Sequence, residues 1–122
     1  MKFLTNTHKE NYINLINLSN IHIGDLERKS LFYIIAGNID LFKKKKYIYN
    51  FSKNCIDADC LISDEVDFCF SSKALIRLDF NLYNGYNDNY TTPLYLLGSL
   101  DSDNYTIAND AINLRFSKQT FI

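Results

Sequence analysis

The sequence predicts a mostly α-helical protein, a single compact bundle of five or six helices with little or no strand. Polar capping residues precede stretches in which apolar residues recur at helical spacing, and glycines stand where several of these stretches end. The chain contains only one proline. Its 122 residues, 47% of them hydrophobic, allow one domain with one core. We therefore expect residues 1–122 to form a single helical domain.

The first helix is predicted to begin at Thr7. Thr7 and Glu10 have the spacing of a capping box, in which each side chain satisfies a backbone N–H of the other residue. The helix should end near Ser19. Its predicted apolar stripe comprises Tyr12, Ile13, Leu15 and Ile16.

A second helix is predicted over residues 26–36, because Asp25 is a favourable N-cap residue. Residues 31–36 are apolar on every side of the helix, so they should lie in the centre of the core. Gly37 is expected to end the helix in a left-handed conformation.

The middle of the chain is predicted to be less regular. Asn38 can cap a short helix over residues 39–42, and residues 47–51 alternate in a way that fits either a strand or a helical turn. Residues 54–70 are rich in aspartate and contain all three cysteines, and we expect them to form an irregular segment.

Three helices are predicted in the remainder of the chain. Ser71 or Ser72 should cap a helix over residues 73–84 that Gly85 closes. Thr92 followed by Pro93 predicts a short helix over residues 94–97, which Gly98 ends. A last helix should open at Asp101 or Ser102. Its expected apolar face comprises Tyr105, Ala108, Ile112 and Phe116.

Charge is balanced over the whole chain but not along it. Residues 1–53 carry a net charge of +5 and residues 54–122 a net charge of −6, and no lysine or arginine lies between Arg77 and Arg115. Such a division favours one basic and one acidic surface. The sequence shows no secretory leader, no apolar stretch long enough to span a membrane and an odd number of cysteines, so we expect a cytoplasmic protein with reduced thiols and no membrane partner.

Several segments resemble an uncharacterised family of small proteins of unknown function from low-GC bacteria, their phages and mobile elements. The segments are Glu27-Arg28-Lys29, residues 31–34, residues 36–38, Tyr49-x-Phe51 and, above all, residues 71–86, with the motif Asn81-Leu82-Tyr83-Asn84-Gly85. The likeness spans about residues 3–116. It implies a small helical protein that is often carried on mobile DNA, and it implies no activity or catalytic residue.

The cysteines raise the possibility of a metal site. Cys55, Cys60 and Cys69 could bind zinc with His22 or His8 as the fourth ligand, because thiolates and imidazoles are the ligands that zinc takes in proteins. The closely spaced cysteine pairs of most zinc sites are absent, which favours small hydrophobic side chains packed in a loop. We therefore expect no cofactor, and a metal-dependent enzyme is the third hypothesis.

Acidic residues crowd the same part of the chain. Asp57, Asp59, Asp64, Glu65 and Asp67 lack the glycine and terminal glutamate of an EF-hand loop, so they do not indicate a calcium site. Together with Asp101 and Asp103, they could instead imitate the phosphates of a nucleic acid and bind the Lys and Arg side chains of a nucleic-acid-binding protein.

Four consecutive lysines support a second hypothesis. Lys43, Lys44, Lys45 and Lys46, with Tyr47 and Tyr49, combine cations and stackable rings, as single-strand-binding proteins do. The sequence pI of about 6.0 lies below the range usual for such proteins.

The end of the helix over residues 73–84 is the most distinctive segment. Its amide and phenol groups could recognise a partner, or they could serve only to shape the turn and to satisfy buried backbone; they belong to Asn81, Tyr83, Asn84 and Tyr86. On the same helix, Arg77 could pair with Asp25 or Glu27.

No nucleophile–base pair, phosphate-binding loop or metalloprotease motif is present, so we do not expect an enzyme. The sequence is interpreted as a non-catalytic protein-interaction module from a phage or mobile element. Its expected partner is a host protein such as a nucleic-acid-handling defence complex, which it would inhibit as anti-CRISPR proteins do. The oligomeric state is left open.

Overall fold

The computed structural model describes residues 1–118, which are mostly helical, as predicted. Two strands form a short antiparallel ribbon in which Tyr49 pairs with Ile56 and Asn50 with Cys55. In chain order the elements are α1 (Asn6–Ser19), α2 (Leu26–Gly37), α3 (Ile39–Lys43), α4 (Lys45–Ile48), β1 (Tyr49–Asn50), β2 (Cys55–Ile56), the 3-10 helix η1 (Ala58–Leu61), α5 (Phe70–Asn84), α6 (Pro93–Leu97) and α7 (Ser102–Arg115). None of the helices in this part of the chain is long and apolar enough to cross a bilayer.

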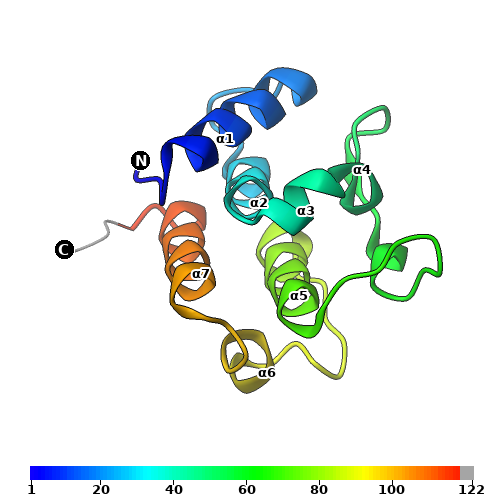
Figure 1. The fold of residues 1–122 in the computed structure, drawn as a ribbon. Helices are drawn as coiled ribbons and strands as arrows, with labels where there is room; N and C mark the ends of the chain where they lie inside the picture. The colour runs from blue at the N-terminus through cyan, green and yellow to red at the C-terminus, as the bar shows by residue number, and fades with distance from the viewer. Residues whose placement is uncertain (119–122) are drawn as a thin grey trace.

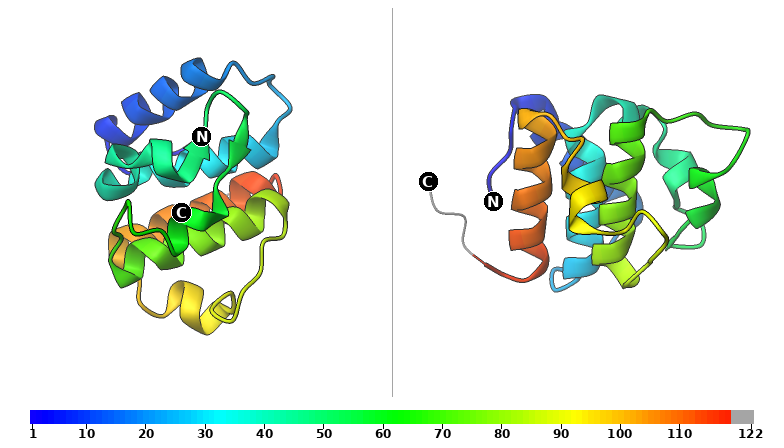
Figure 2. Two further views of the ribbon diagram at one scale, coloured as in Figure 1. Left: turned by 90° about the vertical axis from the view of Figure 1, so that its right-hand side faces the viewer. Right: turned by 90° about the horizontal axis from the view of Figure 1, so that it is seen from below.

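Helix α2 is the centre of the fold, and α1, α5 and α7 pack around it (Figure 1). Helix α6 lies below α5 and α7 in the view of Figure 1. The segment from α3 to η1 lies on one side of α5 and α7 lies on the other, as the view from below also shows (Figure 2). Of residues 47–51, for which the sequence allowed either structure, the first two end α4, the next two form strand β1, and Phe51 lies in the turn that follows.

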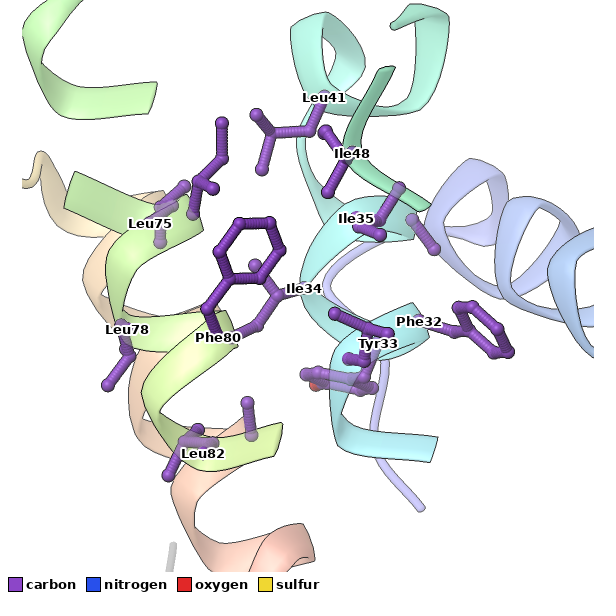
Figure 3. Packing of buried hydrophobic residues seen from close by; sticks show 14 of the residues in the cluster. Phe32, Tyr33, Ile34, Ile35, Leu41, Ile48, Leu75, Leu78, Phe80 and Leu82 are labelled. Atoms are coloured by element: carbon purple, nitrogen blue, oxygen red, sulfur yellow. The ribbon is translucent and has the colours of Figure 1, made fainter. Parts of the chain in front are cut away.

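The core forms where α2 faces α5. Residues 31–36 are all buried, as their continuous apolar pattern predicts. Figure 3 shows Ile34 of α2 and Phe80 of α5 between the two helices, with Leu41 and Ile48 closing one end. Helix α2 therefore organises the bundle, because it contacts α1, α3, α5 and α7.

Helix α1 begins earlier than predicted, and three of the four residues of its predicted apolar stripe, Tyr12, Leu15 and Ile16, face the core. Thr5, not Thr7, is the N-cap, because its hydroxyl accepts a hydrogen bond from the backbone N–H of His8 at 3.0 Å. Leu15 is fully buried, whereas Ile13, predicted in the apolar stripe, is 47% exposed. The earlier start of α1 does not change which of its residues share a face. It is the docking of α1 on α2 that selects the buried face.

Helix α5 also begins earlier than predicted. It starts at Phe70 with Cys69 in the N-cap position and without a side-chain cap bond, so neither Ser71 nor Ser72 is the cap. Ser72 is buried and donates a hydrogen bond to the carboxylate of Asp40 at 3.3 Å. Its hydroxyl therefore joins α5 to α3 instead of capping the helix.

Two of the three glycines at the predicted helix ends, Gly37 and Gly85, serve different purposes. Gly85 adopts the expected left-handed conformation, with φ at 83°. Gly37 does not: α2 runs through it, and Asn38, in an extended conformation, caps α3. A Cβ atom at Gly37 would lie 2.8 Å from Ile107 and 3.1 Å from His8, so the glycine allows α1, α2 and α7 to approach closely.

Helix α7 buries only part of the predicted face, a part that includes Ala108. Its buried residues are Ile107, Ala108 and Ala111. Tyr105 and Phe116, both expected in the core, are 50% and 56% exposed, and Ile112 is half-buried. Because Ile107 of α7 packs closely against Gly37 of α2, Tyr105 and Phe116, which point away from Ile107 on the helix, are left at the surface.

His8 fastens the chain that precedes α1 to the core. Its ring is 2% exposed, and its Nδ1 accepts a hydrogen bond from the Leu4 N–H at 3.1 Å. The other ring nitrogen, Nε2, must therefore carry the proton, which it donates to the Tyr33 carbonyl at 2.9 Å. The rings of Phe3 and Tyr33 lie 5.1 and 4.5 Å from the His8 ring, centroid to centroid. His8 is thus held in its neutral form.

We expect His8 to make the protein less stable in mild acid. Burial lowers the pKa of His8, although its hydrogen bond to Tyr33 and the charge of Asp110 act in the opposite direction. As the pH is lowered, His8 is therefore protonated in the unfolded chain before it is protonated in the folded protein. The free energy of unfolding decreases as the pH falls below about 6.5, the pKa of histidine in the unfolded chain. Between pH 7 and pH 5, wild type should lose about 1 kcal/mol more than His8→Gln in urea unfolding. His22→Gln is the control, because His22 is exposed, and it should follow wild type. Parallel pH profiles of wild type and His8→Gln would contradict this role.

Candidate functional site

The predicted acidic residues lie on an exposed segment that extends from η1 to α5. We call residues 57–67 the acidic segment. Its carboxylates, those of Asp57, Asp59, Asp64, Glu65 and Asp67, are all exposed, and within residues 1–118 none of them forms an ion pair. Cys60, Leu61 and, just after the segment, Phe68 are buried and hold it against the core.

An apolar side chain lies among these carboxylates. Ile62 is 83% exposed, and Phe70, at the start of α5, is 60% exposed. Asp57 also has a local role, since its carboxylate caps η1 by accepting a hydrogen bond from the Asp59 N–H at 3.1 Å. The segment thus presents unpaired negative charge and exposed apolar area on an anchored scaffold.

Asp101 and Asp103 do not join this surface. Both are exposed at the start of α7, where Asp101 is the N-cap and accepts a hydrogen bond from the Asn104 N–H at 2.8 Å. Helix α7 and the acidic segment lie on opposite sides of α5 (Figures 1 and 2). The predicted group of seven carboxylates is therefore two groups.

The lysine cluster, Lys43–Lys46, is only partly available to a ligand. Lys44 pairs with Asp40 at 2.8 Å and donates a hydrogen bond to the Asp67 carbonyl, and Lys45 lies 4.2 Å above the ring of Phe42. Lys43 and Lys46 are exposed, as is Tyr47 at 43%.

The nucleic-acid hypothesis was wrong about Tyr49, which was expected to be available for stacking. Its ring is fully buried, with its centroid 5.1 Å from that of Phe32, so it cannot stack on a base. Two exposed lysines and one exposed tyrosine remain from the predicted combination. Residues 47–51 alternate, and the structure turns the side chain of Tyr49 toward the core. The sequence alone did not show which of the two alternating faces would be buried.

The cysteines do not assemble a metal site. Cys60 is buried, which raises the pKa of its thiol to about 12, whereas Cys55 and Cys69 are exposed. Hydrogen bonds with Ser71 and Ser72 lower the pKa of the Cys69 thiol. Across residues 1–118, no three histidine, cysteine or acidic side chains lie close enough to hold a metal ion.

The Asn81–Tyr86 motif shapes the turn after α5. The Asn81 side-chain amide donates a hydrogen bond to the Tyr86 carbonyl at 2.9 Å, and the Asn84 side chain accepts one from the Tyr86 N–H at 3.1 Å. Tyr83 is half-buried, and Asn84 is exposed. The motif therefore closes a helix and starts the loop that follows it.

That loop is organised by Asp88, which the sequence analysis did not single out. Its carboxylate accepts hydrogen bonds from the Arg77 Nε, the Tyr86 hydroxyl, the Tyr90 N–H and the Thr91 hydroxyl, at 2.8–2.9 Å. Burial alone would raise the pKa of Asp88, but these hydrogen bonds lower it to about 2. Arg77 therefore pairs with Asp88, not with Asp25 or Glu27 as predicted. The Asp-x-x-Thr spacing could have indicated this loop.

Two segments that carry the family resemblance meet at a polar pocket of about 440 Å³. The pocket is lined by His22, Gly24, Asp25, Glu27, Arg28, Tyr83 and Asn84. Arg28 donates hydrogen bonds to the Tyr49 hydroxyl at 2.9 Å, to Asp25 at 3.0 Å and to the Asn54 carbonyl at 2.7 Å. Its guanidinium carbon lies 5.6 Å from the centre of the Tyr83 ring. Arg28 thus joins α2, the ribbon and α5, which gives Arg28 and Tyr83 a structural role.

Comparison with known proteins adds a family but no activity. A family model described as a family of unknown function, DUF6075, matches residues 1–121. No curated protein and no solved structure matches the chain.

Proposed function

Since the chain belongs to DUF6075, a family of unknown function, we propose its function from its own surface: a non-catalytic module that binds a basic partner protein through the acidic segment. The observation that carries the proposal is that five carboxylates of this segment are exposed and unpaired among residues 1–118. Ile62 and Phe70 add exposed apolar area beside them. An apolar centre with a charged rim is typical of protein interfaces.

In its finer form, the proposal concerns a partner that handles nucleic acid. Carboxylates on an anchored segment can occupy the Lys and Arg sites that otherwise bind phosphates. We propose that the chain comes from a phage or mobile element and inhibits a host defence complex of this kind. This form is supported by the family resemblance and by the charge of the segment.

The test compares two variants that carry the same net charge. Asp64→Lys/Glu65→Lys reverses two charges in the acidic segment, while Glu10→Lys/Asn14→Lys/Asn17→Lys alters exposed positions on α1. Each acid-to-lysine change raises the net charge by two and each asparagine-to-lysine change by one. The immobilised proteins are incubated with host lysate, with and without nuclease, and the retained proteins are identified by mass spectrometry.

We expect wild type and the α1 variant to retain a stoichiometric partner after nuclease treatment, and the acidic-segment variant to lose at least about 90% of it, as for charge reversal in an interface. Retention of the same partner by the acidic-segment variant would contradict the proposal, and so would the absence of any partner. Nucleic acid retained by wild type and lost in Lys43→Ala/Lys46→Ala would favour the alternative function.

A further inference from the structure

Most carboxylates of the acidic segment lie on a stretch of chain without regular structure. Residues 62–69 belong to no helix or strand. Within the described residues, no hydrogen bond between backbone groups involves residues 63–68, and the only one inside this stretch joins the Glu65 N–H to the Ser63 hydroxyl at 3.0 Å. A contact from elsewhere in the chain must therefore hold these carboxylates in place.

Lys44, a member of the lysine cluster, makes that contact. Its ammonium group donates a hydrogen bond to the Asp67 carbonyl and lies 5.1 Å from the centre of the buried Phe68 ring. Among residues 1–118, no other side chain from outside the stretch forms a hydrogen bond or ion pair with residues 63–68. The stretch is otherwise held by apolar packing of Val66 and Phe68 on the core.

Lys44 is itself held in position. Its ammonium group pairs with one carboxylate oxygen of Asp40 at 2.8 Å, and the other oxygen of Asp40 accepts a hydrogen bond from the buried Ser72 hydroxyl at 3.3 Å. Because Ser72 belongs to α5, a chain of contacts runs from α5 through Asp40 and Lys44 to Asp67. A donor that is already fixed orders the carbonyl that it binds at little further cost in conformational entropy.

We propose that Lys44, although it is a cation, is a positioning residue that strengthens the binding of a basic partner, because it holds the carboxylates of residues 64–67 in one arrangement. This inference rests on the function proposed above. A segment that is fixed in advance loses less entropy on binding than a mobile one. The direct electrostatic effect has the opposite sign, since a lysine near the interface repels a basic partner. The two effects therefore predict opposite results when Lys44 is replaced.

The test replaces Lys44 with methionine, which keeps a long side chain but has no ammonium group. Lys46→Met is the matched control, because Lys46 is exposed and its side chain forms no ion pair among residues 1–118, so that both variants lose the same charge from the same cluster. Lys44→Arg keeps the cation. The partner retained from nuclease-treated host lysate is quantified for each immobilised protein. Backbone order parameters of residues 62–69 are measured by NMR relaxation without the partner.

We expect Lys44→Met to retain at least about fivefold less partner than wild type, although it is the more acidic protein. Lys46→Met should retain at least as much as wild type, and Lys44→Arg should stay within about twofold of it. The order parameters of residues 62–69 should fall below about 0.6 in Lys44→Met alone, while those of α1 should not change, which shows that the variant is folded.

Equal retention by wild type and Lys44→Met would overturn this role of Lys44 and leave the proposed function standing, as would unchanged order parameters. Equal losses in Lys44→Met and Lys46→Met would also overturn it, since both lysines would then contact the partner directly. If wild type retained no partner, the proposed function would fail, and the role of Lys44 would fail with it.

Discussion

Replacing Asp79 with asparagine is expected to raise the free energy of unfolding by about 1–3 kcal/mol at neutral pH. Asp79 lies on α5 with 1% of its surface exposed, and neither carboxylate oxygen has a hydrogen-bond partner among the described residues. An unpaired charge inside a protein is far less stable than one in water. The wild-type protein must therefore either protonate Asp79 on folding or bury an unpaired carboxylate. Both cost free energy at neutral pH and lower the stability of the folded protein.

The stabilisation by Asp79→Asn should depend on pH, in a direction that follows from the pKa of Asp79. Burial raises the pKa of Asp79 well above its ordinary value. The stability that wild type has when Asp79 is neutral in both states is present below about pH 4, the pKa in the unfolded chain. It is lost as the pH rises toward the pKa in the folded state, by about 1.4 kcal/mol per pH unit. Asp79→Asn removes this loss, so its advantage should grow from pH 4 upward.

Urea unfolding of wild type and Asp79→Asn at pH 4, 6 and 8 measures the difference. Asp64→Asn removes the same charge from an exposed position in the acidic segment and should follow wild type. Asp79→Ala, which removes the carboxyl altogether, should also show a flatter pH profile than wild type. If wild type and Asp79→Asn changed in parallel over this range, Asp79 would not be the uncompensated group that the structure shows.

Replacing Arg28 with alanine is expected to lower the free energy of unfolding by about 2–3 kcal/mol, the largest loss we expect from a single surface-accessible side chain. Arg28 joins α2 to the ribbon through its hydrogen bonds to the Tyr49 hydroxyl and the Asn54 carbonyl, and it contacts α5 through the ring of Tyr83. Its side chain is 26% exposed, and Tyr49 is fully buried. Alanine would leave the buried Tyr49 hydroxyl without this donor and would free the tip of the ribbon.

Arg28→Lys separates charge from geometry. Lysine keeps the positive charge but lacks the planar group with donors on three nitrogens, so we expect it to recover less than half of the loss. Lys9→Ala on α1 is the control for removal of one exposed cation and should change stability by less than about 0.5 kcal/mol.

Hydrogen exchange followed by mass spectrometry would show where Arg28→Ala acts. Amides of residues 49–56 should exchange faster than in wild type, while those of α1 should not change. A variant as stable as wild type, or one in which every helix exchanged faster to the same extent, would contradict the specific role of Arg28 in holding the ribbon to α2 and α5.

Much of the candidate surface could be anticipated from the sequence, and part of it could not. Charged residues between short elements are exposed in most proteins, so the exposure of the acidic segment follows from its composition. Asp101 and Asp103 have the same chemistry, but their separation from that segment depends on which side of α5 each element lies. The exposure of the Tyr90 and Tyr95 rings was not predicted, because these residues have no apolar periodicity that distinguishes an exposed ring from a buried one.

The sequence by itself determined where most helices form and how several of them end. Asp25, Asn38, Thr92 and Asp101 each accept the expected hydrogen bond at the start of a helix, and Gly85 closes α5 in the left-handed conformation. These features depend on groups that lie two to five residues apart, and such interactions form without reference to the rest of the chain.

Only the tertiary structure decided which faces are buried and which charges meet. Gly37 is needed for the approach of Ile107, seventy positions away, and Tyr49 is buried beneath Arg28 of a different element. Arg77 could have paired with any nearby carboxylate, and the folding of the 86–91 loop against α5 brought Asp88 to it. Contacts of this kind arise from the packing of whole helices, so no local pattern of residues records them in advance.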